Sequence, residues 1–559
     1  IDELVVDGNF PRAELGLLRL TESDDARDAA RAWQRLIELY QARELRDDAA
    51  TAAVRLKQLG DVALPGETTA AKWVEHEIAD GKLSAATSSN LPDWSSLAFR
   101  LERTVGTHNY SEVIHECPVP DARWPFFATE RFQYQMVHHP VATQRLMVSG
   151  VDDNQLDWSL PLRQKAASAL GFGVSTRTVG HQMLVFHREV LHLLSPVDRR
   201  VVWTRAMESR GVGYFDPLQL NRRPPVPFLS GNEFLNRSAD PADEAQRNGL
   251  LTMCTSELVA YRGRRVLTIV DAATGEWRWE LRDVPSDARL LATRDLIFVS
   301  SNKWPSGLLL RARDGHPLPL DDTLRDRFSK AKLTLGADLL LLNRVTQDGK
   351  SQIVVERWNP LRRAAVWRQT FANTDQFTWL DSQTLAAISA DHSLHTLDVD
   401  SGERLRLGVM QVSDLAGRNG RCVIGDRDHV FLIVSSERNN NYYNDEFVSI
   451  PANGMIYAFD RRTGGERWHQ KVDNQSLIVH QFAACPVLFF STRRFEQRGQ
   501  FGTQQSSLLL IDKKTGRKLF DETFPNQASG YRGLNLNLAE RHLELLTNND
   551  RLRLIGEEK

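Results

Sequence analysis

The chain has 559 residues, enough for more than one domain, and its net charge of −2 argues against a nucleic-acid partner. Charged residues make up 25% and apolar residues 41%, an ordinary soluble balance, and no stretch approaches the roughly 20 apolar residues of a membrane span. The four scattered cysteines, which include no Cys-x-x-Cys and no adjacent pair, favour buried free thiols over a structural disulfide: Cys117, Cys254, Cys422 and Cys485.

Residues 1–105 are predicted to form a helical, TPR-like domain. Trp33, Leu36 and Tyr40 recur at helical spacing after Ser23-Asp24-Asp25, a run typical of a helix N-terminus. The aromatic side chains favour a helix–helix core, and a partner-binding groove is the alternative. Pro118 and Pro120 indicate a linker, which we place at residues 106–124.

From residue 125 to residue 559 one unit recurs, seen most fully at residues 455–470. A strand alternates apolar residues and ends at Asp460, a turn contains Thr463 and Gly464, and Trp468 begins the return strand. An aromatic side chain at this fixed offset can pack over a neighbouring turn and fix one sheet to the next. The residues predicted to dock sheets in this way are Trp203, Asp271, Thr274, Gly275, Trp279, Trp367, Asp460, Thr463, Gly464, Trp468, Asp512, Thr515 and Gly516.

The copies of the unit predict a mainly β fold with about eight propeller blades. The positions equivalent to Asp460, called anchors below, are 150, 195, 271, 311, 359, 398, 460 and 512. Units of one type that recur every roughly 40–50 residues are typical of propellers. A last pair of strands, at 543–547 and 551–555, is expected to pair with the first blade and close the ring.

The long connections are predicted to gather on one mouth of the ring. An insertion at 209–255, rich in proline, is expected to be a packed loop rather than sheet. In a blade of strands A to D, this D–A connection and three long B–C hairpins lie opposite the Thr-Gly turns. Binding sites are often built on such loops, although drift in unconstrained loops is the alternative. The residues predicted to bind a protein partner are Trp304, Arg438, Tyr442, Tyr443, Arg494, Phe495 and Phe501.

The pattern Ala458-x-Asp460-x-x-Thr463-Gly464-x-x-x-Trp468 resembles the tryptophan-docking repeat of the quinoprotein, or PQQ-like, β-propellers. A short helical array before such a propeller is most similar to PQQ-binding-like repeat proteins of planctomycete-type bacteria. The resemblance implies a fold and an extracytoplasmic location. It implies little about function, because that family includes both dehydrogenases and cofactor-free scaffolds such as the outer-membrane assembly lipoprotein.

The sequence favours a non-catalytic scaffold that binds other proteins, with a degenerate PQQ-dependent dehydrogenase as the alternative. Quinoprotein dehydrogenases use a calcium ion and often a vicinal disulfide, whereas this chain has no adjacent cysteines and no complete calcium loop. His138-His139, His187, His192, His392 and His395 form no metal-ligand pattern and are interpreted as solvated or core-satisfied. We therefore expect no catalytic residue, metal, cofactor or nucleic-acid partner.

Overall fold

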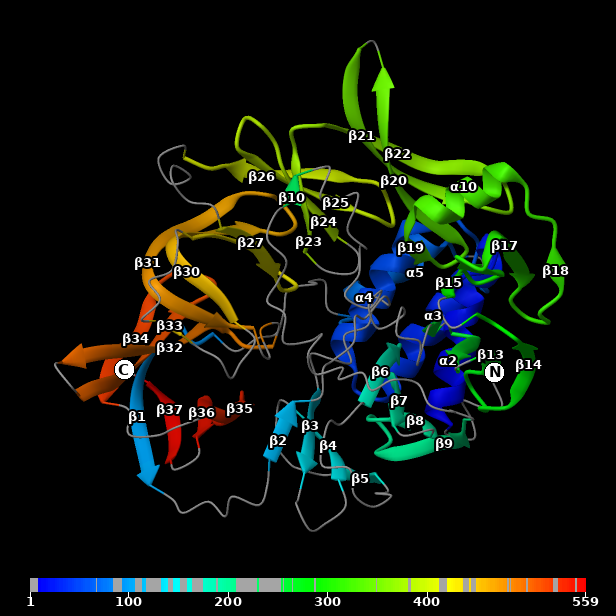
Figure 1. The fold of residues 1–559 in the computed structure, drawn as a ribbon. Helices are drawn as coiled ribbons and strands as arrows, with labels where there is room; N and C mark the ends of the chain where they lie inside the picture. Colours follow the sequence, from blue (N-terminus) through cyan, green and yellow to red (C-terminus); the bar gives the residue numbers. More distant parts are fainter. Residues whose placement is uncertain are drawn as a thin grey trace.

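The computed structural model contains a group of helices followed by sheets arranged around a centre (Figure 1). It describes residues 9–66, 68–83, 93–105, 113–116, 132–138, 144–150, 158–162, 174–187, 190–207, 229–230, 253–254, 256–263, 265–285, 288–347, 349–380, 384–411, 420–435, 442–443, 449–479, 482, 484–498, 501–525, 531–547 and 550–558.

The helices α2 (Phe10–Thr21), α3 (Ala26–Ala42), α4 (Arg46–Gln58) and α5 (Ala70–Ala79) pack each on the next along the chain. Asp25 begins α3 by accepting a hydrogen bond from Arg27 N at 2.8 Å, as the Ser-Asp-Asp run predicts. Buried leucines, alanines and Tyr40 form the seam between them. No helix in the described ranges is long and apolar enough to span a membrane.

The strands form antiparallel meanders, which we call units and number in chain order. Unit 1 is β2 (Val113–Glu116), β3 (Phe132–His138), β4 (Gln144–Gly150) and β5 (Trp158–Leu162). Unit 2 is β6 (Val174–Val179), β7 (Gln182–His187), β8 (Val190–Ser195) and β9 (Arg200–Ala206). Unit 3 is β11 (Met253–Cys254), β12 (Leu258–Arg262), β13 (Val266–Asp271) and β14 (Trp277–Arg282). Unit 4 is β15 (Arg289–Ala292), β16 (Leu296–Ser301), β17 (Trp304–Arg311) and β18 (Pro317–Leu318), followed by α10 (Asp322–Lys330).

Unit 5 is β19 (Ala331–Leu335), β20 (Asp338–Gln347), β21 (Lys350–Asn359) and β22 (Ala364–Ala372). Unit 6 is β23 (Gln376–Trp379), β24 (Thr384–Ile388), β25 (Ser393–Asp398) and β26 (Arg404–Val409). Unit 7 is β27 (Gly420–Gly425), β28 (His429–Ser435), β30 (Ser449–Asp460) and β31 (Glu466–Ile478). Unit 8 is the end of β31 with β32 (Val487–Arg498), β33 (Phe501–Asp512) and β34 (Lys518–Pro525).

This arrangement is a β-propeller, because each unit is an antiparallel meander and its first strand lies toward the centre (Figure 1). Neighbouring first strands contact one another, as β6 contacts β11 and β23 contacts β27. All eight predicted anchors are the last residues of third strands, at the ends of β4, β8, β13, β17, β21, β25, β30 and β33. Units 7 and 8 are joined through β31 into one sheet.

The ring closes differently from the prediction. The strands β36 (His542–Thr547) and β37 (Asp550–Glu558) pair not with the first blade but with β35 (Tyr531–Asn537) and β1 (Leu97–Val105). This closing sheet adds a meander that carries no anchor. The strand β1 lies inside residues 1–105, which were predicted to be helical, and β2 lies inside the predicted linker. The large apolar residues Leu97, Phe99 and Leu101 alternate with smaller or charged ones, which is strand periodicity.

Two parts of the insertion at 209–255 are sheet rather than loop. Residues Leu229–Ser230 form β10, which pairs with β23, the first strand of unit 6, opposite Phe377 and Gln376. Residues Met253–Cys254, at the end of the insertion, form β11, which pairs with β12. The prediction of a loop without sheet is therefore wrong at these four residues. Neither pair contains proline, which lacks the backbone N–H that a strand donates.

Candidate interaction surfaces

Each Asp/Thr-Gly turn is organised by its own anchor side chain. In unit 3 the Oδ1 atom of Asp271 accepts hydrogen bonds from Ala273 N and Thr274 N, both at 2.9 Å, and from Thr274 Oγ1 at 3.1 Å. Gly275 then adopts a φ of +69°, a left-handed conformation that favours glycine. These hydrogen bonds fix the conformation of the short turn, so a neighbouring side chain can pack on a surface of constant shape.

The predicted tryptophans lie against the turn of the following unit. The Trp203 indole Nε1 donates to Ala272 O at 2.9 Å, and the Trp468 Nε1 donates to Lys513 O at 2.9 Å. Trp279 donates likewise to Ala312 O at 2.7 Å. A Cβ at Gly275 would lie 2.6 Å from the Trp203 ring. The glycine thus lets the ring approach the turn, which links one unit to the next.

Trp367 makes the same contact with the turn of unit 6, where its Nε1 donates to Asp400 O at 3.2 Å. Asp460, Thr463 and Gly464 form the turn of unit 7, and Asp512, Thr515 and Gly516 form the turn of unit 8. Arg406 stands at the aromatic position of unit 6, and its backbone oxygen, not an indole ring, is the described atom nearest to a Cβ placed at Gly464 in the turn of unit 7.

The hairpins of units 7 and 8 come together on the B–C side of the ring. The short strand β29 (Tyr442–Tyr443) pairs with β32, so that Tyr442 lies opposite Arg494 and Tyr443 opposite Arg493. The Arg494 side chain is exposed, whereas Arg493 is only 7% exposed. Phe495 and Phe501 lie farther along the same hairpin, on β32 and β33, opposite Gln504 and Arg498.

Two predicted binding residues are not among those that the structure brings together here. Arg438 lies outside the described residues. Trp304 begins β17 in unit 4 and is partly buried against the apolar cluster around Val299 and Leu310. The structure therefore brings together the predicted residues of units 7 and 8 and places Trp304 in a different part of the ring.

The opposite side of the ring, which carries the A–B and C–D turns, is where the helices pack. One apolar cluster contains residues of all four helices together with Leu184, Leu193, Val259 and Val270 of units 2 and 3. Ion pairs extend this contact around the ring to units 2, 3, 5 and 6: Arg43–Asp198 at 3.2 Å, Arg19–Glu257 at 3.1 Å, Asp24–Arg362 at 3.4 Å and Arg55–Asp400 at 3.2 Å.

A buried polar network lies at the centre of this helix contact. The Glu14 carboxylate of α2 accepts from Tyr40 OH at 2.9 Å, from Gln182 Nε2 at 2.8 Å and from His181 N at 3.1 Å. The His181 ring lies between two carboxylates, with Nδ1 2.6 Å from Glu14 and Nε2 3.1 Å from Asp48. Burial alone would lower the pKa of His181, but the charges of Glu14 and Asp48 outweigh it and raise that pKa to about 10.

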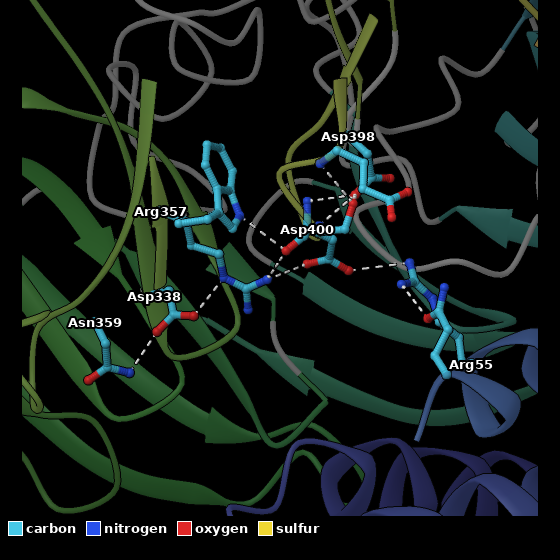
Figure 2. A network of polar contacts seen from close by, with 10 residues as sticks. Arg55, Asp338, Arg357, Asn359, Asp398 and Asp400 are labelled. Atoms are coloured by element: carbon cyan, nitrogen blue, oxygen red, sulfur yellow. Dashed lines mark hydrogen bonds and ion pairs between the residues drawn. The ribbon is translucent and has the colours of Figure 1, made fainter. Parts of the chain in front are cut away.

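A second network joins α4 to units 5 and 6 (Figure 2). The Arg357 guanidinium lies between Asp338, at 2.7 Å from Nε, and Asp400, at 3.0 Å from Nη1. Asn359 donates to Asp338 at 2.6 Å, and Arg55 approaches Asp400 from the helix. Asp400 is therefore shared between the ring and the helices.

Near the end of α2, Arg294 of unit 4 donates to the backbone oxygen of Glu22 and pairs with Asp295 at 3.0 Å. Burial raises the pKa of the Glu22 carboxyl to about 7, against the opposing attraction of Arg294. The negative charges of Asp295 and Glu257 also raise the pKa of Glu22. Several carboxylates therefore lie close together between the end of α2 and the ring.

Sequence reasoning missed both Glu14 and His181. A readable signal was present, since Glu14 lies four residues after Phe10 and three before Leu17, on the apolar stripe of α2. A carboxylate in that position requires a buried partner. Among the described residues, no group of three or more His, Cys, Asp or Glu side chains is arranged to hold a metal ion.

No protein-family model matches this chain, and a search of curated proteins finds no match. The chain is similar to several solved structures at low identity. The crystal structure of BamB from Moraxella catarrhalis is 14% identical over 68% of this chain and 96% of that chain, with a TM-score of 0.25. The WD40 domain of SCAP from fission yeast is 9% identical over 82% and 98%, with a TM-score of 0.32.

A europium-containing methanol dehydrogenase is 10% identical over 66% of this chain and 82% of that chain, with a TM-score of 0.25. Likenesses at this level carry no argument about this protein. The propeller architecture is evident from the strand order of the chain itself.

Proposed function

We propose that this chain is a non-catalytic scaffold that binds another protein through the hairpins of units 7 and 8. The observation that carries the proposal is the asymmetry of the two sides of the ring. The helices occupy the turns of units 2 to 6, through the buried contact of Glu14 with His181 and the ion pairs around it. The hairpin side carries Tyr442 and Tyr443 beside Arg494.

The residue types at this place suit a protein partner. Tyrosine and arginine are enriched among the side chains that dominate binding energies at protein interfaces. The pairing of β29 with β32 also limits the freedom of the hairpin backbone, which lowers the entropy lost when a partner binds. Trp304 is not included, because it packs against its own sheet.

The architecture that goes with this function is part of the proposal. A helical array with TPR-like pairing precedes β1, and an approximately eight-bladed propeller follows, closed by the sheet that contains β1. An extracytoplasmic location and bacterial origin are included on the strength of the quinoprotein-like repeat alone.

Photo-crosslinking tests the proposed face. A benzoyl-phenylalanine placed at Tyr442 should capture a partner from an extract of the native host. The matched position is Leu361, a turn residue on the opposite side of the ring that is 57% exposed. Deleting residues 494–504, which removes Arg494 and leaves the crosslinker at position 442 in place, should abolish the adduct. Capture from Leu361 alone, or an adduct that survives the deletion, would assign binding to the other side.

The alternative function, a degenerate PQQ-dependent dehydrogenase, makes a separate prediction. Purified protein incubated with the quinone and calcium would then reduce a redox dye in the presence of simple alcohols or sugars. The scaffold proposal predicts no turnover in this assay. Turnover that depends on both additions would replace the proposal.

A further inference from the structure

In units 2, 3 and 6 the residue two positions after the anchor touches the helices on the turn side of the ring. We call it the tip residue. In units 2 and 3 the tip residues Val197 and Ala273 pack against the helix cluster. In unit 6 the tip residue Asp400 pairs with Arg55 of α4 at 3.2 Å. The chemistry of a tip residue thus matches the chemistry of what covers it.

In units 7 and 8 the tip residues are Arg462 and Lys514, and both are exposed. The residues just before them point elsewhere. Arg461 donates to Asp426 O at 2.8 Å, and Lys513 pairs with the Asp426 carboxylate at 2.9 Å. Arg461 and Lys513 are thus used inside the ring, whereas the tip residues Arg462 and Lys514 are exposed.

The two turns lie side by side, because Trp468 of unit 7 donates to Lys513 O of unit 8. Residues 512–518 contain four basic residues and one acidic residue, Asp512, which is occupied by its own turn. Arg462 and Arg517 are exposed and have no carboxylate partner among the described residues. Lys514 has one, Asp93 at 3.5 Å, with both side chains more than half exposed.

We propose that Arg462, Lys514 and Arg517 form a second docking surface, which binds an acidic segment of a partner protein. We call it the basic turn surface. It lies on the opposite side of the ring from the hairpins of the proposed function and is independent of them. The helices show how such a surface is filled, because Asp24 approaches Arg362 of unit 5 in the same way. The Asp93–Lys514 pair shows that a carboxylate reaches the basic turn surface itself.

The experiment uses the full chain and a fluorescein-labelled peptide of repeated Glu and Ala residues, with binding measured by fluorescence anisotropy at physiological ionic strength. Replacing Arg462, Lys514 and Arg517 together by glutamate should weaken binding by roughly tenfold or more, because like charges then face the peptide. The matched control is Arg313→Glu, a change at the tip residue of unit 4, which is 77% exposed. It should bind as the wild type does.

Three results would overturn the proposal. The triple variant could bind as well as the wild type, although its melting temperature shows that it is folded. Duplex DNA could compete as strongly as the peptide, which would indicate a general response to polyanions. Sedimentation could show that the wild-type chain self-associates and the triple variant does not, which would make the occupant a second copy. If the triple variant does not fold, Lys514→Ala/Arg517→Ala, which should weaken binding in the same direction, replaces it.

Discussion

The turns of units 3 and 8 have the same geometry but face different surroundings. In unit 3 the residue after the anchor is Ala272, which is 1% exposed beneath the helices. In unit 8 the equivalent residue is Lys513, which is 2% exposed and needs a carboxylate, the oxygen of Phe482 and the Phe482 ring around its ammonium group. A buried cation is stable only when it is paired.

The comparison shows that the residues after the anchor differ between turns according to what lies against each turn. Where the helices provide apolar contact, the turns have small apolar residues such as Ala272 and Ala273. In units 7 and 8 the equivalent residues are Arg461 and Lys513. Arg461 donates to the backbone oxygen of Asp426 in unit 7, and Lys513 pairs with the carboxylate of the same residue. Burial would raise the pKa of Asp426, but Lys513 and His429 hold that pKa well below its ordinary value.

The largest expected effect follows from breaking the helix contact at Glu14. Glu14→Ala leaves His181, Tyr40 and Gln182 without their shared carboxylate in a fully buried site. Removing one partner of a buried ionic network costs about 3–5 kcal/mol of unfolding free energy. Urea unfolding measures the loss, and hydrogen exchange should rise in α2–α4 but not in β30–β34.

The control for this variant is Arg35→Ala, which breaks an exposed pair with Glu38 on α3 and should cost about 0.5 kcal/mol or less. If exchange increased equally in β30–β34, the helices and units 7 and 8 would behave as one cooperative body. The turns beneath the helices and the turns of units 7 and 8 would then not belong to regions of different stability.

A somewhat smaller effect is expected from Lys513→Met, which leaves Asp426 buried without its cation. We expect a loss of about 3 kcal/mol, confined by hydrogen exchange to β27–β34. The double variant Lys513→Met/Asp426→Asn should lose clearly less than the single one, because neither charge remains. Losses that simply add would show that the two side chains are not coupled.

The sequence predicted the ring well because its repeat is local. Asp460, Thr463 and Gly464 form their bonds within one turn, so spacing alone identifies them, and every anchor was placed at the end of a third strand. The strand β1 was missed because it follows four helices and pairs with β37, whose residues lie more than 400 positions later. Nothing local distinguishes such a closing strand from a linker.

The position of the helices could not be predicted for the same reason. Glu14 and His181 are 167 residues apart, and each looks like an ordinary polar residue until its burial is known. The proximity of Tyr442 to Arg494 was predictable, because equivalent hairpins of adjacent units must be neighbours. The tip residues of the turns that contact the helices differ from the tip residues of units 7 and 8. This difference becomes visible only when the units are compared with one another.

The smallest expected effect tests the charged corner beneath α2. Because the pKa of Glu22 in the folded state, about 7, lies above its ordinary value of 4.5, the folded protein favours the protonated carboxyl. The resulting penalty is absent below pH 4.5, grows as the pH rises and is complete above pH 7. Glu22→Gln removes it, so the variant should gain stability over the wild type at pH 8 and not at pH 4. The side chain is only partly buried, so the gain should be about 1 kcal/mol or less.

Thermal unfolding from pH 4 to pH 8 measures this difference, with Glu403→Gln on an exposed turn as the control. A Glu22→Gln variant that is less stable than the wild type at pH 8 would show that the ionised carboxylate attracts Arg294 more strongly than burial and the neighbouring acids oppose it. The acid would then hold α2 onto unit 4. The contact would resemble the pairing of Asp426 with Lys513, and the two regions of the ring would differ less than their turns suggest.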